Sequence, residues 1–236
     1  MDQLFLFSVS LDTFLQSIAK RGGMSMTNGY DIKFNLTGDL KSYMDSIGIG
    51  TVGGAVDASN QGGLIEMLCD EAQLPNVQAA TGQLSGRVLG ENQVNYAYAK
   101  FYSDLSLTWM CDADMTPLKF VTAWHGFIFS GEGGDDDRPV KGPTGLTGML
   151  SQAPLSSSRA IRLNYPEKYL CPTMRITKTE KNAGAPNGRA PISYILENAF
   201  PYSVDAVPLS YGTSQITKVT ANFYYEKHTV VFGNGK

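Results

Sequence analysis

A six-residue run, Asp104-Leu105-Ser106-Leu107-Thr108-Trp109, alternates without exception between polar and apolar side chains. Successive side chains of a β-strand point to opposite faces, so Leu105, Leu107 and Trp109 share one face. An antiparallel sheet that packs on one face and meets water on the other produces this pattern. The run therefore predicts a half-buried strand of an antiparallel sheet.

Two other segments repeat the alternation. Near the C-terminus Val219, Ala221, Phe223 and Tyr225 alternate with Lys218, Thr220, Asn222 and Tyr224, and a shorter alternation covers 161–165. Both segments are predicted to be strands of the same kind.

One helix is clearly signalled between these strands, over Thr116–Ile128. Thr116 can cap it, Pro117 suits the first helical position, and apolar residues follow at helical spacing until Gly126, which is expected to end it. We expect a mainly β protein, an antiparallel barrel or sandwich with one packed α-helix and long loops. The predicted core between strands and helix comprises Leu105, Leu107, Trp109, Phe120, Trp124, Val219 and Phe223.

The rest of the chain divides around this domain. Residues 1–23 are expected to form an N-terminal arm, with helical spacing of apolar residues before Gly22-Gly23. The β domain is expected to span 24–230, with long Gly- and Ser-rich loops at about 37–63 and 131–158. Residues 231–236 are expected to be a flexible C-terminus.

Composition limits the classes of partner. The 236 residues are 42% hydrophobic, enough for a substantial core, and carry 19 basic and 22 acidic residues, a net charge of −3. No global positive field would hold a polyanion, so tight nucleic-acid binding is disfavoured. No apolar stretch reaches the roughly 20 residues of a membrane-spanning helix, and a soluble protein made inside the cell, without a membrane partner, is expected.

Motifs that resemble enzyme sites lack their structural context. Residues 48–53 match GxGxxG, but no strand pattern precedes them and no helix pattern follows, so a loop is favoured over a dinucleotide site. Asp112 with Asp114, and the run at 135–137, offer oxygen ligands without EF-hand spacing, and a polar turn and a solvated loop tip are favoured.

The histidines and cysteines give no catalytic pattern either. His125 is expected to be a structural imidazole at the end of the helix, and His228, after the last predicted strand, to be exposed. Cys69 precedes two acidic residues that would raise its pKa, and Cys69, Cys111 and Cys171 lie too far apart for a zinc knuckle. We expect no catalytic, cofactor or metal site.

An aromatic cluster and a turn are the candidate contact residues. Tyr96, Tyr98, Phe101 and Tyr102, with Lys100, could stack on single-stranded nucleic acid, but without a basic surplus a strand or subunit-interface role is favoured. The predicted subunit interface comprises Leu74, Pro75, Tyr96, Tyr98, Phe101 and Tyr102.

Three segments together resemble the tail-tube family of contractile-tailed phages. They are Leu-Cys-Asp-Glu-Ala-Gln-Leu-Pro at 68–75, Phe-Pro-Tyr-Ser-Val-Asp-Ala-Val-Pro-Leu-Ser-Tyr at 200–211, and Gln-Ile-Thr-Lys-Val-Thr-Ala-Asn-Phe-Tyr-Tyr at 215–225. The last segment is similar to the family's closing β-strand. The resemblance covers roughly 62–228, and its motifs are strand patterns without a catalytic signature.

The resemblance implies a virion structural protein. Family members form hexameric rings whose inner strands join into a continuous barrel, and the rings stack into a tube for DNA and the tape-measure protein. Neighbouring rings, the baseplate hub and the sheath would be the partners, in a virion tail assembled in the host cytoplasm. The arm at 1–23 and the loop at 131–158 depart from the simplest tube pattern, so a main tube subunit and a baseplate tube initiator both stay open. A β-rich module that binds a receptor or glycan is the alternative, with an enzyme the least favoured.

Overall fold

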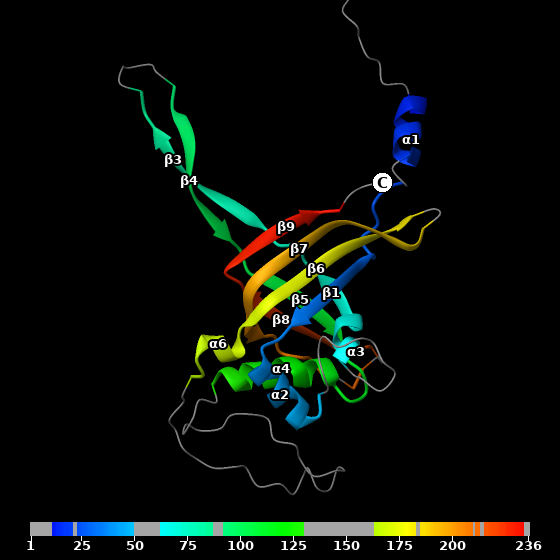
Figure 1. Ribbon diagram of the computed structural model, residues 1–236, viewed down its shortest axis with the longest axis vertical. Coiled ribbons are helices and arrows are strands. Elements are labelled where there is room, and N and C mark those ends of the chain that lie inside the picture. The colour runs from blue at the N-terminus through cyan, green and yellow to red at the C-terminus, as the bar shows by residue number, and fades with distance from the viewer. Residues whose placement is uncertain are drawn as a thin grey trace, which may run out of the picture.

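The computed structural model describes residues 11–20, 23–49, 62–86, 92–129, 163–182, 185–209, 211–212 and 215–233 (Figure 1). The predicted loop at 131–158, including its acidic run at 135–137, and residues 1–10 of the predicted arm lie outside these ranges.

Strands are the commonest element of the described chain. They are β1 (Tyr30–Asn35), β2 (Cys69–Ala72), β3 (Val77–Leu84), β4 (Val94–Tyr102), β5 (Leu105–Met110), β6 (Cys171–Asn182), β7 (Ala185–Val204), β8 (Lys218–Tyr224) and β9 (Lys227–Phe232). Seven of them form one sheet in the order β1-β6-β7-β8-β5-β2, with β9 also paired to β7, while β3 and β4 form a separate two-stranded hairpin. Every strand pair is antiparallel, which confirms the predicted fold class.

The large sheet folds over but does not close, so the barrel alternative was wrong. β1 and β2 stand at the two ends of the strand order and do not pair with each other. The long strand β7 belongs to both halves, pairing with β9 up to Glu197, with β6 up to Ala199 and with β8 from Phe200 onward. Asn198 has φ +56°, a conformation that Asn tolerates better than most residues, and β7 changes partners there. The result is two facing half-sheets that share one bent strand.

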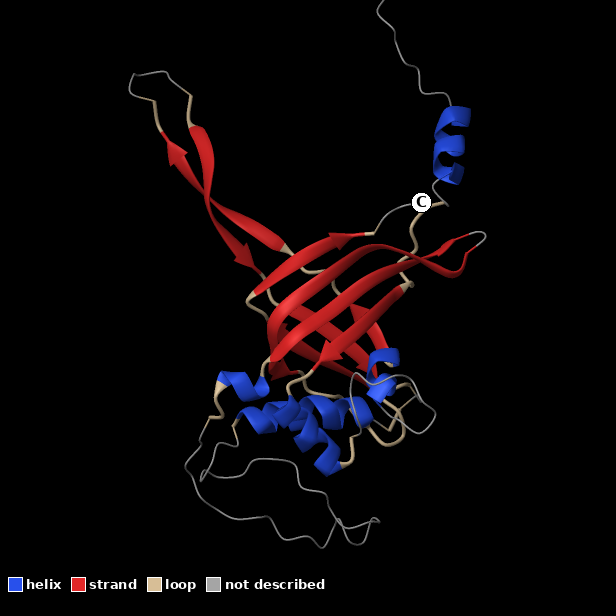
Figure 2. Ribbon diagram, viewed as in Figure 1, coloured by secondary structure: helices blue, strands red, loops and turns tan. Residues whose placement is uncertain are grey.

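Helices gather at one end of the sheet (Figure 2). They are α2 (Gly38–Ile47), α3 (Gly62–Met67), α4 (Thr116–Ile128) and α6 (Pro166–Tyr169), while α1 (Leu11–Lys20) lies apart at the other end. The expectation of a single helix was therefore wrong. Residues 37–63 were expected to be a loop with one weak helical turn near Leu40–Ile47. That turn is the helix α2, which the fully buried Leu40 and Met44 hold in place.

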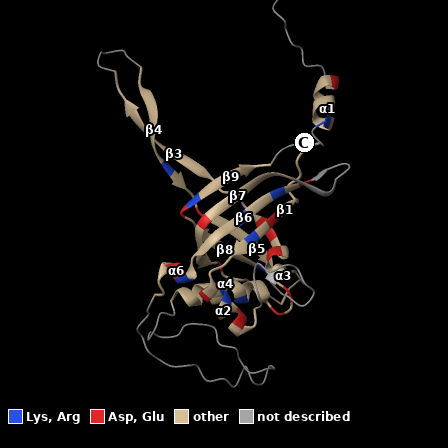
Figure 3. Cartoon of the chain, viewed as in Figure 1, with Lys and Arg blue, Asp and Glu red and all other residues tan. Residues whose placement is uncertain are grey.

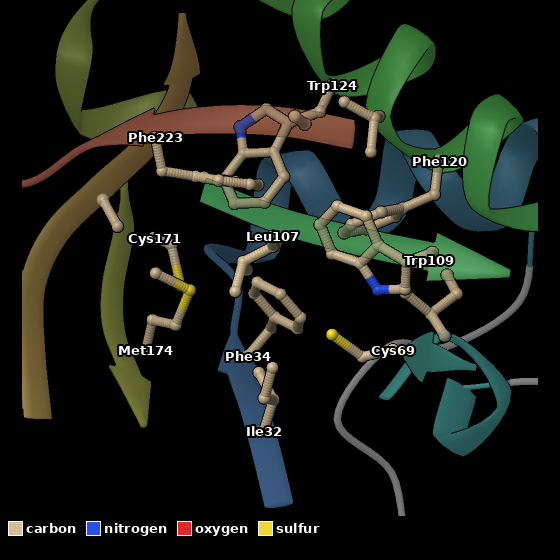
Figure 4. Packing of buried hydrophobic residues seen from close by; sticks show 14 of the residues in the cluster. Ile32, Phe34, Cys69, Leu107, Trp109, Phe120, Trp124, Cys171, Met174 and Phe223 are labelled. Carbon is tan, nitrogen blue, oxygen red and sulfur yellow. The ribbon is translucent and has the colours of Figure 1, made fainter. Parts of the chain in front are cut away.

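The core lies between the two half-sheets and α4. All seven residues predicted for the core are buried, each at 1% exposure or less. Figure 4 shows Phe120 and Trp124 of α4 directed at Trp109 and Phe223 of the strands, with Phe34 below them. The ring centroids of Trp124 and Phe223 are 5.8 Å apart, and those of Phe34 and Phe120 are also 5.8 Å apart, in edge-to-face contact.

The start of α4 explains one of the acidic motifs. Thr116 donates its backbone N–H and its hydroxyl to the two carboxylate oxygens of Asp112, at 2.6 and 2.7 Å. Burial alone would raise the pKa of Asp112, but these hydrogen bonds outweigh it and lower the pKa. The N-cap position is Met115 and not Thr116, which is the first helical residue and donates its N–H to Asp112. α4 continues past Gly126 to Ile128.

Two other element assignments need correction. The described part of the predicted strand at 161–165 is not a strand. Asn164 instead hydrogen-bonds to the end of α4, donating its backbone N–H to the carbonyl of Ile128 at 2.9 Å. Residues 231–232, expected in a flexible tail, belong to β9 and pair with β7.

Candidate subunit interfaces

The outer edge of β9 is an unpaired row of backbone groups. Gly233 donates its N–H to the carbonyl of Pro191 on β7 at 2.9 Å, and hydrogen bonds alternate along an antiparallel ladder. The backbone groups of Thr229 and Val231 therefore face β7, and those of His228, Val230 and Phe232 face outward. No strand of the described chain pairs on that side of β9. Such an edge is a template for a strand from another chain.

The opposite margin of this half-sheet is β1. Its partner β6 pairs with β7, which pairs with β9, so one four-stranded half-sheet has β1 and β9 as its two edges. Figure 1 shows these four strands side by side as one twisted layer. Among the described residues neither edge pairs with a further strand, so copies of this half-sheet can join side by side.

The hairpin of β3 and β4 projects away from the sheet (Figure 1). Its strands pair with each other from Val77 opposite Tyr102 to Leu84 opposite Val94. Large apolar side chains on both strands are exposed, among them Tyr98 at 67% and Phe101 at 57%. An isolated two-stranded hairpin is marginally stable in water, and contiguous exposed apolar surface marks an interaction site.

A glycine shapes the hairpin's surface. Gly82 lies opposite Tyr96, and a Cβ on Gly82 would come within 2.8 Å of the tyrosine ring. The missing side chain lets the Tyr96 ring lie across β3, a packing known to compensate for glycine in strands. Lys100 lies 4.8 Å from the centre of the Tyr102 ring, in cation–π range, and is the one charged residue of the two described strands (Figure 3).

The hairpin joins the sheet at an aromatic cluster around His228. The rings of Tyr102, Tyr194 and Tyr225 lie 5.0, 5.7 and 5.9 Å from the imidazole centre. His228 is 8% exposed, so the expectation that it is exposed was wrong, because β9 carries it back onto the sheet. Its Nδ1 is buried with no hydrogen-bond partner within the described structure. Tyr225 completes the joint by donating its hydroxyl to the carbonyl of Asn76, ahead of β3, at 3.4 Å.

The environment of His228 predicts a pH dependence of stability. Burial, with a smaller effect of Lys100, lowers the pKa of His228. The unfolded chain, with an ordinary histidine pKa of about 6.5, then binds more protons than the folded chain at mildly acidic pH. His228 therefore favours the folded state above about pH 6.5, and this contribution is lost as the pH falls through its lower folded pKa, by at most about 1.4 kcal/mol per pH unit.

Urea unfolding at pH 7.5 and pH 5.5 measures this effect. The drop in unfolding free energy between the two values should be smaller in His228→Phe, which keeps an aromatic ring among the tyrosines but cannot titrate. Equal drops in both proteins would contradict the assignment, because other groups would then account for the whole effect.

The predicted interface residues fall into two groups. Tyr96, Tyr98 and Phe101 are exposed on the hairpin, and Leu74, at 49% exposure, lies just before its base. Pro75 is buried and Tyr102 packs against the core, so these two belong to the joint of the hairpin. The structure therefore exposes four of the six residues predicted for the interface and packs the other two at the base of the hairpin.

The motifs that resemble enzyme sites have structural roles where they are described. Gly48 is the left-handed C-cap of α2, with φ +81°, so it follows a helix and not the strand of a dinucleotide site, while 50–53 lie outside the described residues. His125 is partly buried, 5.0 Å from the Phe129 ring. Cys69 is a buried free thiol whose pKa is raised to about 12, chiefly by burial and less by the charge of Asp70, while the hydrogen bond to the Glu71 backbone lowers it.

The described residues show neither a metal-binding cluster nor a membrane-spanning helix. The described residues contain no group of three or more His, Cys, Asp or Glu side chains placed to hold a metal ion. Across the same residues, no helix is both long enough and apolar enough to span a bilayer.

The described chain is an open antiparallel sheet with a helical layer at one end and a projecting hairpin. The family model "Phage tail tube protein" matches residues 25–231, and the chain belongs to this family. No curated protein sequence matches the chain.

Solved structures of similar fold are distant in sequence. A chain of the sheath/tube terminator of an extracellular contractile injection system is 9% identical with a TM-score of 0.44, the match covering 88% of this chain and 96% of that one. An Hcp protein is 10% identical with a TM-score of 0.40, covering 87% and 99%. A chain of the anti-feeding prophage baseplate is 13% identical with a TM-score of 0.40, covering 68% and 78%.

The residues that sequence reasoning missed lie mostly on β9. Residues 228–232 read His-Thr-Val-Val-Phe, a run rich in β-branched and aromatic residues that favours a strand. The run's length and composition were a usable signal, but it does not alternate cleanly, since Val231 and Phe232 are both exposed.

Proposed function

We propose that six copies of the chain close into a ring of a phage tail tube, with the half-sheet β1-β6-β7-β9 of each copy joining the next. The observation that carries this proposal is the pair of unpaired edges, β1 and β9, at opposite sides of one half-sheet. Pairing β9 of one copy with β1 of the next satisfies both edges. If the rotation between neighbouring copies closes into a ring, no copy is left with an exposed edge. The half-sheets then form a continuous wall around a channel.

The hairpin is proposed to hold neighbouring copies together outside that wall. Tyr96, Tyr98 and Phe101 present aromatic surface of the kind that carries binding energy at interfaces. The hairpin projects beyond the sheet (Figure 1), so we propose that another copy of the chain packs against its exposed side chains. Leu74, close to its base, extends the same surface.

The channel is proposed to pass DNA and the tape-measure protein without binding them. The net charge of −3 gives the ring no positive field to retain phosphates. The adjacent partners in this proposal are stacked rings of the tube or baseplate hub and a contractile sheath around them, in a virion tail assembled in the host cytoplasm. We propose that the β domain begins at about residue 24 and that an arm precedes it. The proposed ring fits a main tube subunit and a tube initiator equally.

Negative-stain electron microscopy of the purified chain, with mass photometry at increasing concentration, tests the ring. Particles with a central hole and a mass near six subunits are expected, with stacks at high concentration. Because an initiator could require its hub proteins, the same measurement is made with baseplate proteins of the phage. A monomer at every concentration, alone and with the hub, would refute the proposal.

Placing charge on the hairpin should weaken assembly without unfolding the subunit. Tyr98→Glu and Phe101→Glu alter exposed side chains, so the unfolding free energy should change by no more than about 0.5 kcal/mol. Buried in an interface, the unpaired carboxylates should raise the concentration needed for assembly at least about tenfold. Thr122→Glu, exposed on the outer face of α4, is the matched control. Unchanged assembly of both hairpin variants would remove the hairpin from the proposed interface.

A further inference from the structure

The two edges of the half-sheet are not equivalent. Thr179 donates its N–H to the carbonyl of Gly29 at 2.9 Å, so by the alternation of the ladder Asp31 and Lys33 also face β6. The backbone groups of Tyr30, Ile32 and Phe34 therefore face outward from β1. These are the groups that a neighbouring strand would use.

One of these outward groups already has a partner within the subunit. Phe34 donates its N–H to Oε1 of Glu66 at 3.1 Å, and Glu66 lies on the short helix α3. α3 packs beside β1, and its own Ile65 is fully buried. Cys69 follows α3 closely in the chain, and its carbonyl accepts a hydrogen bond from the hydroxyl of Tyr30 on β1 at 2.9 Å. The buried Ile65 before Glu66 and the hydrogen bond of Cys69 with Tyr30 after it thus hold Glu66 against β1.

The carboxyl group of Glu66 is a half-buried cap. Burial raises its pKa, and the hydrogen bond from Phe34 acts in the opposite direction. Moving the Glu66 carboxylate away from β1 would leave the buried Phe34 amide without a hydrogen-bond partner, which is unfavourable in free energy. An incoming strand would have to displace Glu66 to pair at Phe34, whereas Tyr30 and Ile32 offer their outward groups closer to the start of β1.

Register between copies needs such a device. A strand that slips by one residue turns its side chains to the wrong face, which hydrophobic patterning prevents. A slip by two residues keeps every side chain on its face, so patterning cannot prevent it. In a closed sheet the register also sets the strand stagger, and so the tilt and diameter of the barrel.

We propose that Glu66 fixes the register of the ring by ending strand pairing at Phe34, so that β9 of the neighbouring copy pairs along Tyr30–Ile32 and no further. This inference rests on the proposed ring and adds the residue that selects one ring geometry among registers differing by two residues. The partner is a second copy of the chain, and Glu66 is a positioning residue for it.

Three variants of Glu66 test the register stop. Glu66→Ala removes the acceptor, Glu66→Asp retracts the carboxylate by one methylene, and Glu66→Gln keeps an oxygen at the same reach. Native mass spectrometry and class averages should show rings of a single size for wild type and Glu66→Gln, and mixed sizes or diameters for Glu66→Ala and Glu66→Asp. Glu66→Asp keeps the test valid if Glu66→Ala does not fold.

Hydrogen exchange of the Phe34 amide separates this role from a purely structural one. In the unassembled subunit this amide should exchange at least about tenfold faster in Glu66→Ala than in wild type, because a hydrogen bond to a charged group is lost. On assembly of Glu66→Ala it should become protected, because a neighbour's strand now reaches it. Uniform rings of Glu66→Ala with Phe34 still exchanging would overturn the register stop while leaving the ring intact. A wild-type chain that forms no ring would overturn the proposed function, and this inference with it.

Discussion

Val230→Pro is expected to abolish ring closure while leaving the subunit folded. Among the described strands none pairs with the outward N–H of Val230, so proline there removes a donor that the described sheet does not use. The same donor is required when the neighbour's β1 pairs with β9. The proline side chain also obstructs the approach of the neighbour's strand. Because every subunit carries the substitution, this hydrogen bond is lost at every contact between copies. We expect the fraction of rings in mass photometry to fall at least about tenfold.

The neighbouring position provides the matched control. Val231 lies opposite Ser193, and its N–H faces β7, so Val231→Pro should break a ladder bond inside the subunit and lower its own thermal stability. The contrast between the two prolines isolates the free edge from the fold. Rings of Val230→Pro that form at wild-type concentration would show that β9 is not a contact between copies.

Trp124→Ala is expected to cost about 3–5 kcal/mol of unfolding free energy, the largest effect of a single core substitution here. Trp124 is fully buried, with the rings of Phe34, Phe120 and Phe223 at centroid distances of 6.3, 5.6 and 5.8 Å. Its indole Nε1 donates to the carbonyl of Tyr169 at 2.9 Å, which ties α4 to α6. Alanine removes both the packing and this hydrogen bond.

Two phenylalanine variants separate packing from hydrogen bonding. Trp124→Phe loses the bond to Tyr169, whereas Trp109→Phe loses none, because the buried Nε1 of Trp109 has no partner in the described structure. Chemical denaturation should therefore show Trp124→Phe as the more destabilised by about 1 kcal/mol. If Trp124→Ala unfolds with the wild-type midpoint, the assignment of α4 to the core is wrong.

Local patterns were sufficient for the elements that bury one face. The alternation at 104–109 and 218–224 became β5 and β8, which pair with each other from Leu105 opposite Phe223 to Met110 opposite Lys218. The apolar spacing of 116–128 became α4. These segments carry their own periodicity, so their faces and their shared core could be predicted before any contact was known.

Prediction failed where tertiary contacts override weak local signals. The sequence suggests only a weak helical turn near Leu40–Ile47 within the expected loop at 37–63, yet burial of Leu40 and Met44 makes 38–47 a full helix. The run after Tyr225 does not alternate cleanly, and only pairing with β7 makes it β9. The same pairing buries His228, which sequence position alone suggested was exposed.

The candidate interfaces divide in the same way. The hairpin aromatics were predictable because Tyr96, Tyr98 and Phe101 stand out in composition. The free edge of β9 and the cap of Glu66 on Phe34 were not, because an edge exists only once strand order is known. Glu66 and Phe34 are 32 residues apart, and no local pattern connects them.

The sequence by itself determined the class of fold, the core and the membership of the tail-tube family, since these depend on the order and periodicity of apolar side chains along the chain. Only the tertiary structure decided which strand margins stay unpaired, which amide is already occupied and in which direction the hairpin projects. The physical reason is that periodicity is a property of neighbours in sequence, whereas an unsatisfied hydrogen-bonding edge is a property of the completed sheet.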